Sequence, residues 1–403
     1  MTSSRRNSDL RPATLAAQAG GGHDPQTGAV VPPMHASTTY ARDADYALIG
    51  AGRVYSRPDN PTYDAVEALM TGLEGGAASL AFASGLAAIS AVIQAIAGPD
   101  DSGQNGHVVI GRDLYYGTAA LLETFKDAFG LTVDRVDTTD PAAVRAAMKP
   151  GRTRLVIVEP IANPTWAVTD IAAIADIAHE IGAALAVDNT VLTPILFRPL
   201  ESGADLVIHS ATKYLNGHSD VVAGVVTTGA RNPLWQRIEA ARRLSGAVLG
   251  PFEAWLLLRG MRTLSLRVRE QTRAAEAIAR RFDGDPRVAQ VLYPTLAEGV
   301  QRDIAQRQFS QGSGGMLSLR VAPAPGRSAL KTALATIGAT QVFVRATSLG
   351  GVESLIEHRW TVEGGTTGVP DDLLRVSVGI EDIDDLIADL DQALAVAHAR
   401  FPN

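Results

Sequence analysis

Two hydroxyl side chains and a lysine follow an apolar run near the middle of the chain. The segment 205–219 reads DLVIHSATKYLNGHS, in which a predicted strand leads into a loop that carries Ser210, Thr212 and Lys213. Hydroxyl groups donate hydrogen bonds to phosphate oxygens, and a lysine amine attacks a carbonyl to form a Schiff base. Short Ser-x-Thr-Lys matches also occur by chance in surface loops, where the lysine is only solvated. The residue types therefore predict an imine-forming lysine beside a phosphate site.

A carboxylate stands at the end of the preceding apolar strand. Asp188 closes the run ALAVD and is followed by Asn-Thr. A carboxylate at the end of a buried strand is costly unless a cation or hydrogen-bond donors meet it. A protonated pyridine nitrogen is such a cation, and keeping it protonated makes the ring an electron sink. A helix N-cap is the alternative for an isolated Asp, but Lys213, one predicted strand later, favours the cofactor interpretation.

The segment 205–219 resembles the cofactor-lysine segment of the Cys/Met-metabolism family of pyridoxal-phosphate (PLP) enzymes. This family includes cystathionine γ-synthase, the cystathionine β- and γ-lyases and methionine γ-lyase. The resemblance runs from about residue 12 to the C-terminus, with the motifs in family order. It implies PLP, attached to Lys213, and an α/β fold of PLP-dependent transferase fold type I. In that fold a mostly parallel seven-stranded sheet domain carries a smaller C-terminal α+β domain and an extended N-terminal arm.

A second phosphate contact is expected where the run FASGLAA begins an apolar helix. The backbone N–H groups of Gly85 and Leu86 can bind a phosphate at the positive end of the helix dipole. Ser84 as an N-cap would do the same work without a ligand. The stretch is similar to the phosphate-binding helix start of the family, which favours the cofactor interpretation.

The resemblance also assigns contacts to the cofactor ring. It implies that Tyr115 stacks on the ring and reaches the leaving group, and that Asn163 contacts the phenolic oxygen. Tyr116 replaces a glycine of the family's Tyr-Gly-Gly-Thr, and the alternative of a buried structural tyrosine fits Tyr116 better than Tyr115. An ordinary Asn-Pro turn is the alternative for Asn163.

The N-terminal segment carries a tyrosine and an arginine in the run YSRPDNPT. A guanidinium suits phosphate because its donors form a fork. By resemblance, Tyr55 and Arg57 reach the cofactor phosphate of the neighbouring subunit. This implies a homo-oligomer, expected to be a tetramer built from dimers with shared active sites.

Substrate contacts are expected in the C-terminal part. Arg375 lies in the apolar run LLRVSVGIE, where an unpaired charge is costly. The family supplies the α-carboxylate of an amino-acid substrate as its partner, and an internal salt bridge is the alternative. Ser348, in TSLGG, matches the serine that positions the reactive groups.

These residues together predict a mechanism. Lys213 removes the Cα proton, Asp188 supports the electron sink, and Tyr115 is the acid for the leaving group. The unsaturated product can then hydrolyse to a 2-oxo acid or accept a nucleophile. We expect elimination or replacement at the γ (or β) carbon of a sulfur-containing or homoserine-derived amino acid. The alternatives are a γ-lyase for a non-sulfur amino acid such as canavanine, and a PLP-binding protein without turnover.

Several positions depart from the cystathionine-handling members of the family. The cation that usually binds a distal carboxylate is missing, although Arg53 or Arg359 could replace it. This weakens the case for cystathionine or O-succinylhomoserine as substrate. These departures stand at Pro58, Ala120 and Thr347. Gly117 replaces a cysteine of the methionine γ-lyase branch, and the segment 358–365 differs from the family's usual Met-Thr-His stretch.

Composition excludes several other functions. The formal net charge of −7 offers no basic surface for nucleic acid. Without cysteine there is no disulfide or thiolate site, and the eight histidines lack metal-ligand spacing, so no metal is expected. We see no apolar signal segment and no membrane-spanning window. A cytoplasmic protein without membrane or nucleic-acid partners is therefore expected.

The elements that position these residues follow from hydrophobic periodicity. At 403 residues the chain predicts two domains and an arm. We expect an arm over 1–60, a PLP-binding domain over 61–255 and a small domain over 256–403. Short apolar strands alternate with helices after residue 61, which indicates a parallel sheet covered on both faces.

Ligands bind at the carboxyl ends of such strands, where the chain has Asp113, Glu159, Asp188 and Ser210. The run 251–282 predicts one long helix with a possible break at Gly260, and the small domain predicts strands in GGMLSLRV and LLRVSVGIE with helices near 327–337 and 383–399.

Overall fold

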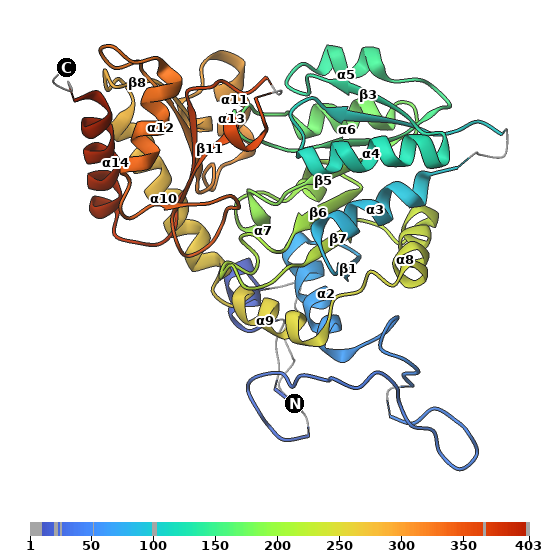
Figure 1. Cartoon of the computed structure of the whole chain (residues 1–403). Coiled ribbons are helices and arrows are strands. Elements are labelled where there is room, and N and C mark those ends of the chain that lie inside the picture. The colour runs from blue at the N-terminus through green and yellow to red at the C-terminus, as the bar shows by residue number, and fades with distance from the viewer. Residues whose placement is uncertain are drawn as a thin grey trace. The chain divides into compact units, whose positions relative to one another are not determined.

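The computed structural model describes residues 10–19, 23–24, 26–50, 52–98, 103–365 and 368–399. The chain forms two compact units, each with its own sheet (Figure 1). Unit 1 comprises Met1–Pro160 and Asp170–Ser265, and unit 2 comprises Ile161–Thr169 and Leu266–Asn403. The expected boundaries at residues 60 and 255 stay a prediction. Within the described ranges, no helix combines the length and the apolar character needed to cross a membrane.

Unit 1 contains a seven-stranded sheet with the strand order β1-β7-β6-β5-β4-β2-β3. Strand β7 is antiparallel to both of its neighbours, and all other neighbouring pairs are parallel. The expected α/β fold with a mostly parallel sheet is confirmed. The strands are β1 (Ala78–Phe82), β2 (His107–Gly111), β3 (Thr132–Val136), β4 (Thr153–Val158), β5 (Ala184–Asp188), β6 (Leu206–Ser210) and β7 (Gly224–Thr228).

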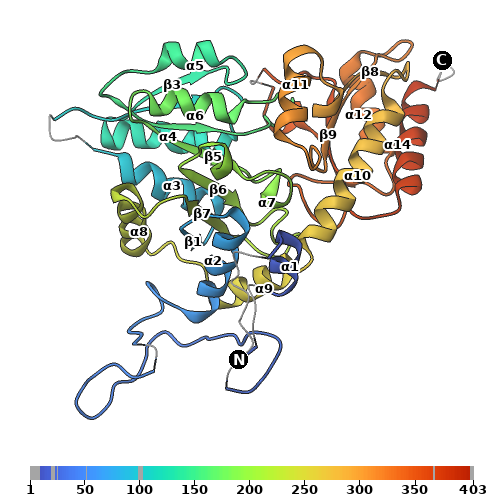
Figure 2. The same ribbon diagram turned by 180° about the vertical axis from the view of Figure 1, so that it is seen from behind.

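Helices cover both faces of this sheet (Figures 1 and 2). Helix α1 lies inside the expected arm, because Pro12 starts a turn that buries Leu15 and Ala16. Parts of the remaining described arm loop away from the sheet and helices of unit 1 (Figure 1), but the arm returns to unit 1 where Trp255 Nε1 donates to the Pro32 carbonyl and the His35 N–H donates to the Thr62 hydroxyl. The helices are α1 (Pro12–Ala17), α2 (Pro61–Glu74), α3 (Gly85–Ile96), α4 (Tyr116–Phe129), α5 (Pro141–Ala147), α6 (Ile171–His179), α7 (Thr193–Leu196), the 3-10 helix η2 (Pro199–Ser202), α8 (Pro233–Ser245) and α9 (Pro251–Met261).

The core of unit 1 explains why its strands are continuous apolar runs. Side chains alternate between the two faces of a strand. Ile110 and Ile157 share a core cluster with Val92 of α3. The neighbouring residues on the opposite face of these strands, such as Val109 and Val156, are equally buried. Both faces are therefore covered, as expected for parallel strands.

The long helix expected over 251–282 is interrupted. Helix α9 ends at Met261 and α10 (Leu264–Phe282) begins three residues later. Gly260 lies in the last turn of α9, where a Cβ would stand 2.2 Å from the carbonyl oxygen of Asn216. Gly260 therefore permits close packing against the loop that carries Lys213.

Unit 2 contains a five-stranded sheet with the order β10-β11-β12-β9-β8. Its core cluster joins α10, α12 and α14 to the sheet. The expected strands in GGMLSLRV and LLRVSVGIE and the two expected helices are present, whereas β8, β10 and β11 were not expected. The strands are β8 (Val288–Leu292), β9 (Met316–Val321), β10 (Val344–Arg345), β11 (Leu355–His358) and β12 (Leu373–Ser377). The helices are η3 (Pro294–Leu296), α11 (Gly299–Gln308), α12 (Ala329–Ala339), α13 (Arg359–Val362) and α14 (Ile383–His398).

Candidate active site

The carboxyl ends of β5 and β6 bring two predicted residues to the same edge of the sheet. Asp188 is the last residue of β5 and Ser210 is the last residue of the neighbouring strand β6. The hydroxyl of Thr190 joins them: it donates to Asp188 Oδ1 at 2.5 Å and accepts from the Ser210 N–H at 2.8 Å. Sequence reasoning missed Thr190, although the Asp-x-Thr spacing is a signal for a local hydrogen-bonded turn.

The environment of Asp188 disfavours its charge. Burial raises the pKa of this carboxyl above its ordinary value, while the two hydrogen bonds from Thr190 and the nearby His209 act in the opposite direction. His209 is itself fully buried and its Nε2 lies 2.6 Å from Oε1 of the equally buried Glu74. An ionised Asp188 therefore calls for a cationic partner.

Lys213 lies in a tight turn that follows β6. Its N–H donates to the Ser210 carbonyl at 3.1 Å, and its own carbonyl accepts from the Gly217 N–H at 2.8 Å. These bonds hold the half-buried lysine one turn beyond Ser210. The predicted hydroxyls and the lysine are thus brought together on one loop.

The Thr212 hydroxyl is already engaged by the backbone. It donates to the Ala223 carbonyl at 3.2 Å and accepts from the Ala223 N–H at 3.0 Å. This pair of bonds joins the lysine turn to the residue that precedes β7. A phosphate contact through Thr212 would require its hydroxyl to exchange a backbone acceptor for a phosphate oxygen.

The start of α3 approaches the end of β6 very closely. A Cβ on Gly85 would lie 3.0 Å from the Cβ of Ser210. The Ser84 side chain accepts from the Ala87 N–H at 3.0 Å and caps the helix. In the first turn, the N–H groups of Gly85 and Leu86 have no intrahelical acceptor. N-cap and phosphate roles are compatible here, because they use different N–H groups.

Tyr115 is the residue before α4. Its N–H donates to Glu159 Oε1 at 3.1 Å, and its side chain is 39% exposed. A Cβ on Gly117 would lie 2.6 Å from the Tyr115 ring, so a glycine at this position makes room for the ring. The buried alternative for Tyr116 is wrong: this residue is 60% exposed, because helix α4 directs it away from the core.

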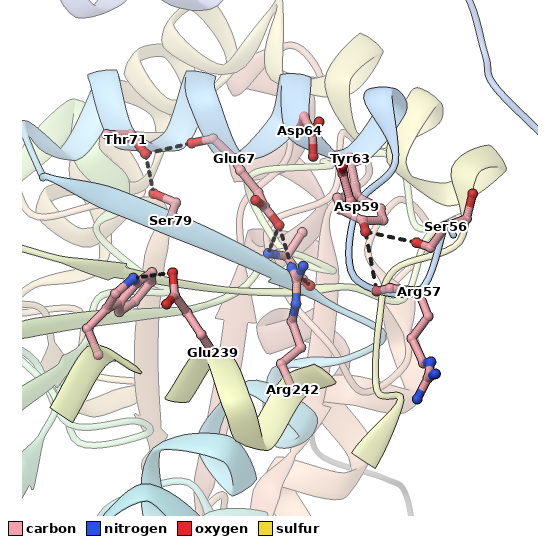
Figure 3. Close-up of polar contacts among 12 residues, drawn as sticks. Ser56, Arg57, Asp59, Tyr63, Asp64, Glu67, Thr71, Ser79, Glu239 and Arg242 are labelled. Carbon is pink, nitrogen blue, oxygen red and sulfur yellow. Dashed lines mark hydrogen bonds and ion pairs between the residues drawn. The ribbon is translucent and has the colours of Figure 1, made fainter. Parts of the chain in front are cut away.

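The described part of the arm holds Tyr55 and Arg57 near the surface of unit 1. Tyr55 is 45% exposed, and Arg57 Nη1 donates to the Arg243 carbonyl at 3.3 Å. Figure 3 shows how Tyr63 of α2 supports this segment: its hydroxyl donates to the Ser56 carbonyl at 2.9 Å. The two predicted arm residues are therefore presented from an anchored base.

A buried ion pair anchors Tyr63 in turn (Figure 3). Arg242 pairs with Glu67 and donates to the Ala81 carbonyl at 2.9 Å, while the Ala81 N–H donates to Glu67 at 2.9 Å. Because β1 is an edge strand, it has no partner among the described strands on its outer side, and the ion pair there satisfies the hydrogen bonds of the Ala81 N–H and carbonyl. The Arg242 guanidinium lies 5.1 Å from the centre of the Tyr63 ring. Burial raises the Tyr63 pKa well above its ordinary value, so the hydroxyl remains a donor.

Asn163 lies in unit 2, in a segment with a cis peptide bond to Pro164. Its Oδ1 is buried and has no hydrogen-bond partner among the described residues. A buried amide atom of this kind is usually satisfied. A bound ligand would complete its hydrogen bonds, and the expected cofactor contact of Asn163 stays a prediction.

Arg375 and Ser348, also in unit 2, contact each other. Arg375 Nη2 donates to the Ser348 carbonyl at 2.7 Å, and Ser348 has a φ of 90°, a value rare outside glycine. Arg375 is 4% exposed and forms an ion pair with Glu357, which is 3% exposed. The internal salt bridge weighed as an alternative is therefore present.

The two arginines considered for a distal carboxylate are already paired with acidic side chains. Each contacts two carboxylates in its own unit. Such pairing lowers the attraction that either guanidinium offers to a third carboxylate. The partners are Asp59 and Asp64 for Arg53, and Glu357 and Glu363 for Arg359.

The donor set fits a phosphate-bearing pyridine aldehyde. A close helix start, a lysine turn and a carboxylate that needs a cation lie together in unit 1, and an unsatisfied buried amide lies in unit 2. The residues placed in unit 1 are Tyr55, Arg57, Gly85, Leu86, Tyr115, Asp188, Ser210, Thr212 and Lys213; those in unit 2 are Asn163, Ser348 and Arg375.

Comparisons with known proteins give one consistent result. Residues 13–395 match the model of the family described as Cys/Met metabolism PLP-dependent enzyme. The chain is 44% identical to the cystathionine gamma-synthase of Mycobacterium tuberculosis H37Rv over 388 residues, covering 95% of this chain and 96% of that protein. It is 41% identical to the L-methionine gamma-lyase of Pseudomonas putida over 389 residues, covering 93% and 95%. The crystal structure of metB from Corynebacterium glutamicum is similar, with a TM-score of 0.89, 38% identity and coverage of 96% and 99%.

Proposed function

Because the chain belongs to the Cys/Met metabolism family of PLP-dependent enzymes, we propose that it acts at the γ carbon of a homoserine-derived or sulfur-containing amino acid. Elimination and replacement are both open to such a site. The named relatives include a cystathionine gamma-synthase and a methionine gamma-lyase, which support γ-carbon chemistry. The expected alternative of a protein without turnover is set aside, since the relatives are enzymes.

We assign the cofactor contacts as follows. Lys213 would hold PLP through its Nζ, and Asp188 would hold the ring nitrogen. Tyr115 would pack on the ring. The phosphate would be bound by Gly85, Leu86, Ser210 and Thr212, together with Tyr55 and Arg57 from a neighbouring copy. The amide of Asn163, in unit 2, would bind the phenolic oxygen.

The chain's own groups then move protons and hold charge. PLP, when bound, supplies an electron sink for the substrate α carbon. The Lys213 amine, freed from the cofactor when the substrate amine replaces it, would take the proton from Cα and return it further along the substrate. The Tyr115 hydroxyl donates a proton to the leaving group, and Arg375 binds the α-carboxylate. Ser348 keeps Arg375 in place through its carbonyl.

One observation supports this proposal above the others. The Thr190 hydroxyl bridges Asp188 and Ser210 at 2.5 and 2.8 Å, and the Ser210 carbonyl accepts from the N–H of Lys213. One short network at the carboxyl ends of two strands thereby joins the proposed ring-nitrogen partner, the proposed phosphate donor and the backbone of the proposed amine residue.

The proposal is tested by covalent labelling of the cofactor lysine and by assays of catalytic activity. Borohydride reduction of the holoenzyme, followed by peptide mass spectrometry, should place the cofactor on Lys213, and Lys213→Ala should abolish this label. Release of 2-oxo acid and formation of new thioether should be assayed with cystathionine, methionine, homocysteine and O-acyl homoserines. Label on another lysine, or no product from any substrate with cofactor bound, would refute the proposal.

A second candidate function is favoured by the pairing of Arg53 and Arg359 with carboxylates. If neither guanidinium accepts a distal carboxylate, the preferred substrate carries a neutral or basic γ-substituent, as in canavanine. Comparing kcat/KM for canavanine and O-acetylhomoserine with that for O-succinylhomoserine distinguishes the two. A clear preference for O-succinylhomoserine would reject this candidate.

The arm supports a proposed homo-oligomer. Val30, Tyr46 and Val54 are each more than half exposed, which is unusual for large apolar side chains spread over one segment. A neighbouring copy of the chain would cover them and would receive Tyr55 and Arg57. We propose a tetramer built from dimers in the cytoplasm, which analytical ultracentrifugation and cell fractionation would test.

A further inference from the structure

Three buried charged side chains of unit 2 and one half-buried carboxylate form an alternating series. Glu357 on β11 lies directly opposite Arg375 on β12, and the two form an ion pair. The other carboxylate oxygen of Glu357 lies 3.1 Å from Arg359 Nη1, and Arg359 Nε lies 2.5 Å from Glu363. The order along the series is therefore Arg375, Glu357, Arg359, Glu363, and Glu357 bridges both guanidinium groups.

These side chains are too deeply buried to be ordinary surface pairs. Their exposed fractions are 4% for Arg375, 3% for Glu357, 8% for Arg359 and 12% for Glu363. Buried ion pairs add little net stability, yet removing one partner leaves an uncompensated charge. A structural role alone gives weak reason to retain four such groups in one series.

The series ends on the residue assigned to the substrate carboxylate. The Arg375 guanidinium is planar, and its Nη2 contacts both the Glu357 carboxylate and the Ser348 carbonyl. Two acceptors on one nitrogen define the plane of the group and hence the direction of its other donors. Glu357 thus sets the orientation in which Arg375 meets a carboxylate.

Arg359 sets how strongly Glu357 competes for Arg375. A carboxylate held between two guanidinium groups divides its attraction between them. Without Arg359, Glu357 would neutralise Arg375 alone and would repel an approaching substrate carboxylate. Glu363, the residue that follows α13, in turn pairs with Arg359, the first residue of that helix.

We infer that Glu357, Arg359 and Glu363 are positioning residues that tune Arg375 for the substrate α-carboxylate. This inference depends on the proposed function, which assigns that carboxylate to Arg375. It adds that the divergent segment 358–365 controls substrate affinity through Glu357, and that it does so without contact with the reacting carbon.

The test compares two ligands that differ only in the α-carboxylate. L-methionine and its decarboxylated amine are titrated into the holoenzyme, and binding is followed by the visible absorbance of the cofactor. Arg359→Met should raise the Kd and KM for methionine at least about tenfold, as expected when a buried charge pair is truncated. It should leave kcat and amine binding close to wild type. Arg359→Lys should restore part of the affinity.

Arg320→Met is the matched control. Arg320 forms a bidentate pair with Asp372 between β9 and the residue before β12 in the same sheet, with contacts of 2.7 and 2.9 Å. Its loss should not change the ratio of methionine to amine affinity. If Arg359→Met does not fold, Glu363→Gln decides, with the same selective loss at smaller size.

The outcomes separate the inference from the proposed function. Equal loss of both ligands, or no loss of either, in folded Arg359→Met or Glu363→Gln would overturn the inference while the function stands. Failure of the wild-type holoenzyme to bind or convert any amino acid would instead reject the proposed function.

Discussion

Gly85 and Ser210 approach each other so closely that a Cβ on Gly85 would lie 3.0 Å from the Ser210 Cβ and 3.1 Å from its Cα. The contact joins the start of α3 to the end of β6. Through it, helix N–H groups reach the point where the lysine turn begins. A phosphate held there would be bound by two elements that can lie this close together because Gly85 has no side chain.

Gly85→Ala should weaken PLP binding. Overpacking a tight site costs about 1–3 kcal/mol, and here the added methyl meets Ser210. The Kd for PLP, measured by titrating the apoprotein, should rise by roughly tenfold or more. Gly338→Ala is the control, because its Cβ would meet nothing within 4 Å. Unchanged PLP affinity in Gly85→Ala would show that the close approach has no part in the site.

Thr190→Val should damage stability and cofactor binding together. The substitution keeps the shape but removes the hydroxyl that donates to Asp188 and accepts from Ser210. Leaving buried polar groups unsatisfied costs about 1–3 kcal/mol in the free energy of unfolding. Urea unfolding of the apoprotein checks the first effect and PLP titration the second. Thr190→Ser, which retains the hydroxyl, should lie close to wild type; equal behaviour of the two variants would contradict the bridge.

Asp188→Asn should separate stability from function with a defined pH dependence. Because burial raises the pKa of Asp188, the folded apoprotein favours the neutral carboxyl. The ionised form therefore costs stability, and this cost is absent below the ordinary pKa and grows as pH rises through the raised pKa. The Asn variant of the apoprotein should match wild type in acid and exceed it near neutral pH, while its catalytic rate falls. Thermal unfolding across pH measures this, and a variant less stable than wild type at every pH would reverse the sign.

Mixing Arg57→Ala with Lys213→Ala tests the shared site. Each variant should be inactive alone, because one lacks the phosphate fork and the other the amine. In a dimer with two equivalent active sites, subunit exchange makes half of the dimers mixed, and each mixed dimer has one intact site, so about a quarter of wild-type activity should return. No recovery after proven exchange would place the whole site in one copy.

Tyr63→Phe should loosen the arm without disturbing the core. The hydroxyl that donates to the Ser56 carbonyl at 2.9 Å is lost, while the ring stays against Arg242. PLP should dissociate faster from the holoenzyme, as measured by transfer to an excess of apo-acceptor enzyme. Tyr293→Phe, which removes an equivalent tyrosine-to-carbonyl hydrogen bond of 2.9 Å in unit 2, is the control. Equal dissociation rates in the two variants would argue against support of the arm by Tyr63.

Much of the fold followed from local patterns. Apolar runs ending at Asp188 and Ser210 predicted strands whose carboxyl ends carry chemistry, and the structure places both residues at the ends of adjacent strands. Strand β1 was missed, because ASLAF has small residues and no clear alternation. The possible break expected at Gly260 lies next to the observed end of α9 at Met261, and this glycine also permits close packing against Asn216.

The sequence by itself determined the family, the cofactor, the lysine motif and the alternation of strands and helices, because each is encoded by residues close together in the chain. Only the tertiary structure showed that Thr190 joins Asp188 to Ser210, that Arg375 faces Glu357, and that Arg53 and Arg359 are already paired. Those partners are chosen by strand register and by the meeting of distant segments. The chemical type of a side chain limits what it can bind, and its neighbours in space decide which of those partners it contacts.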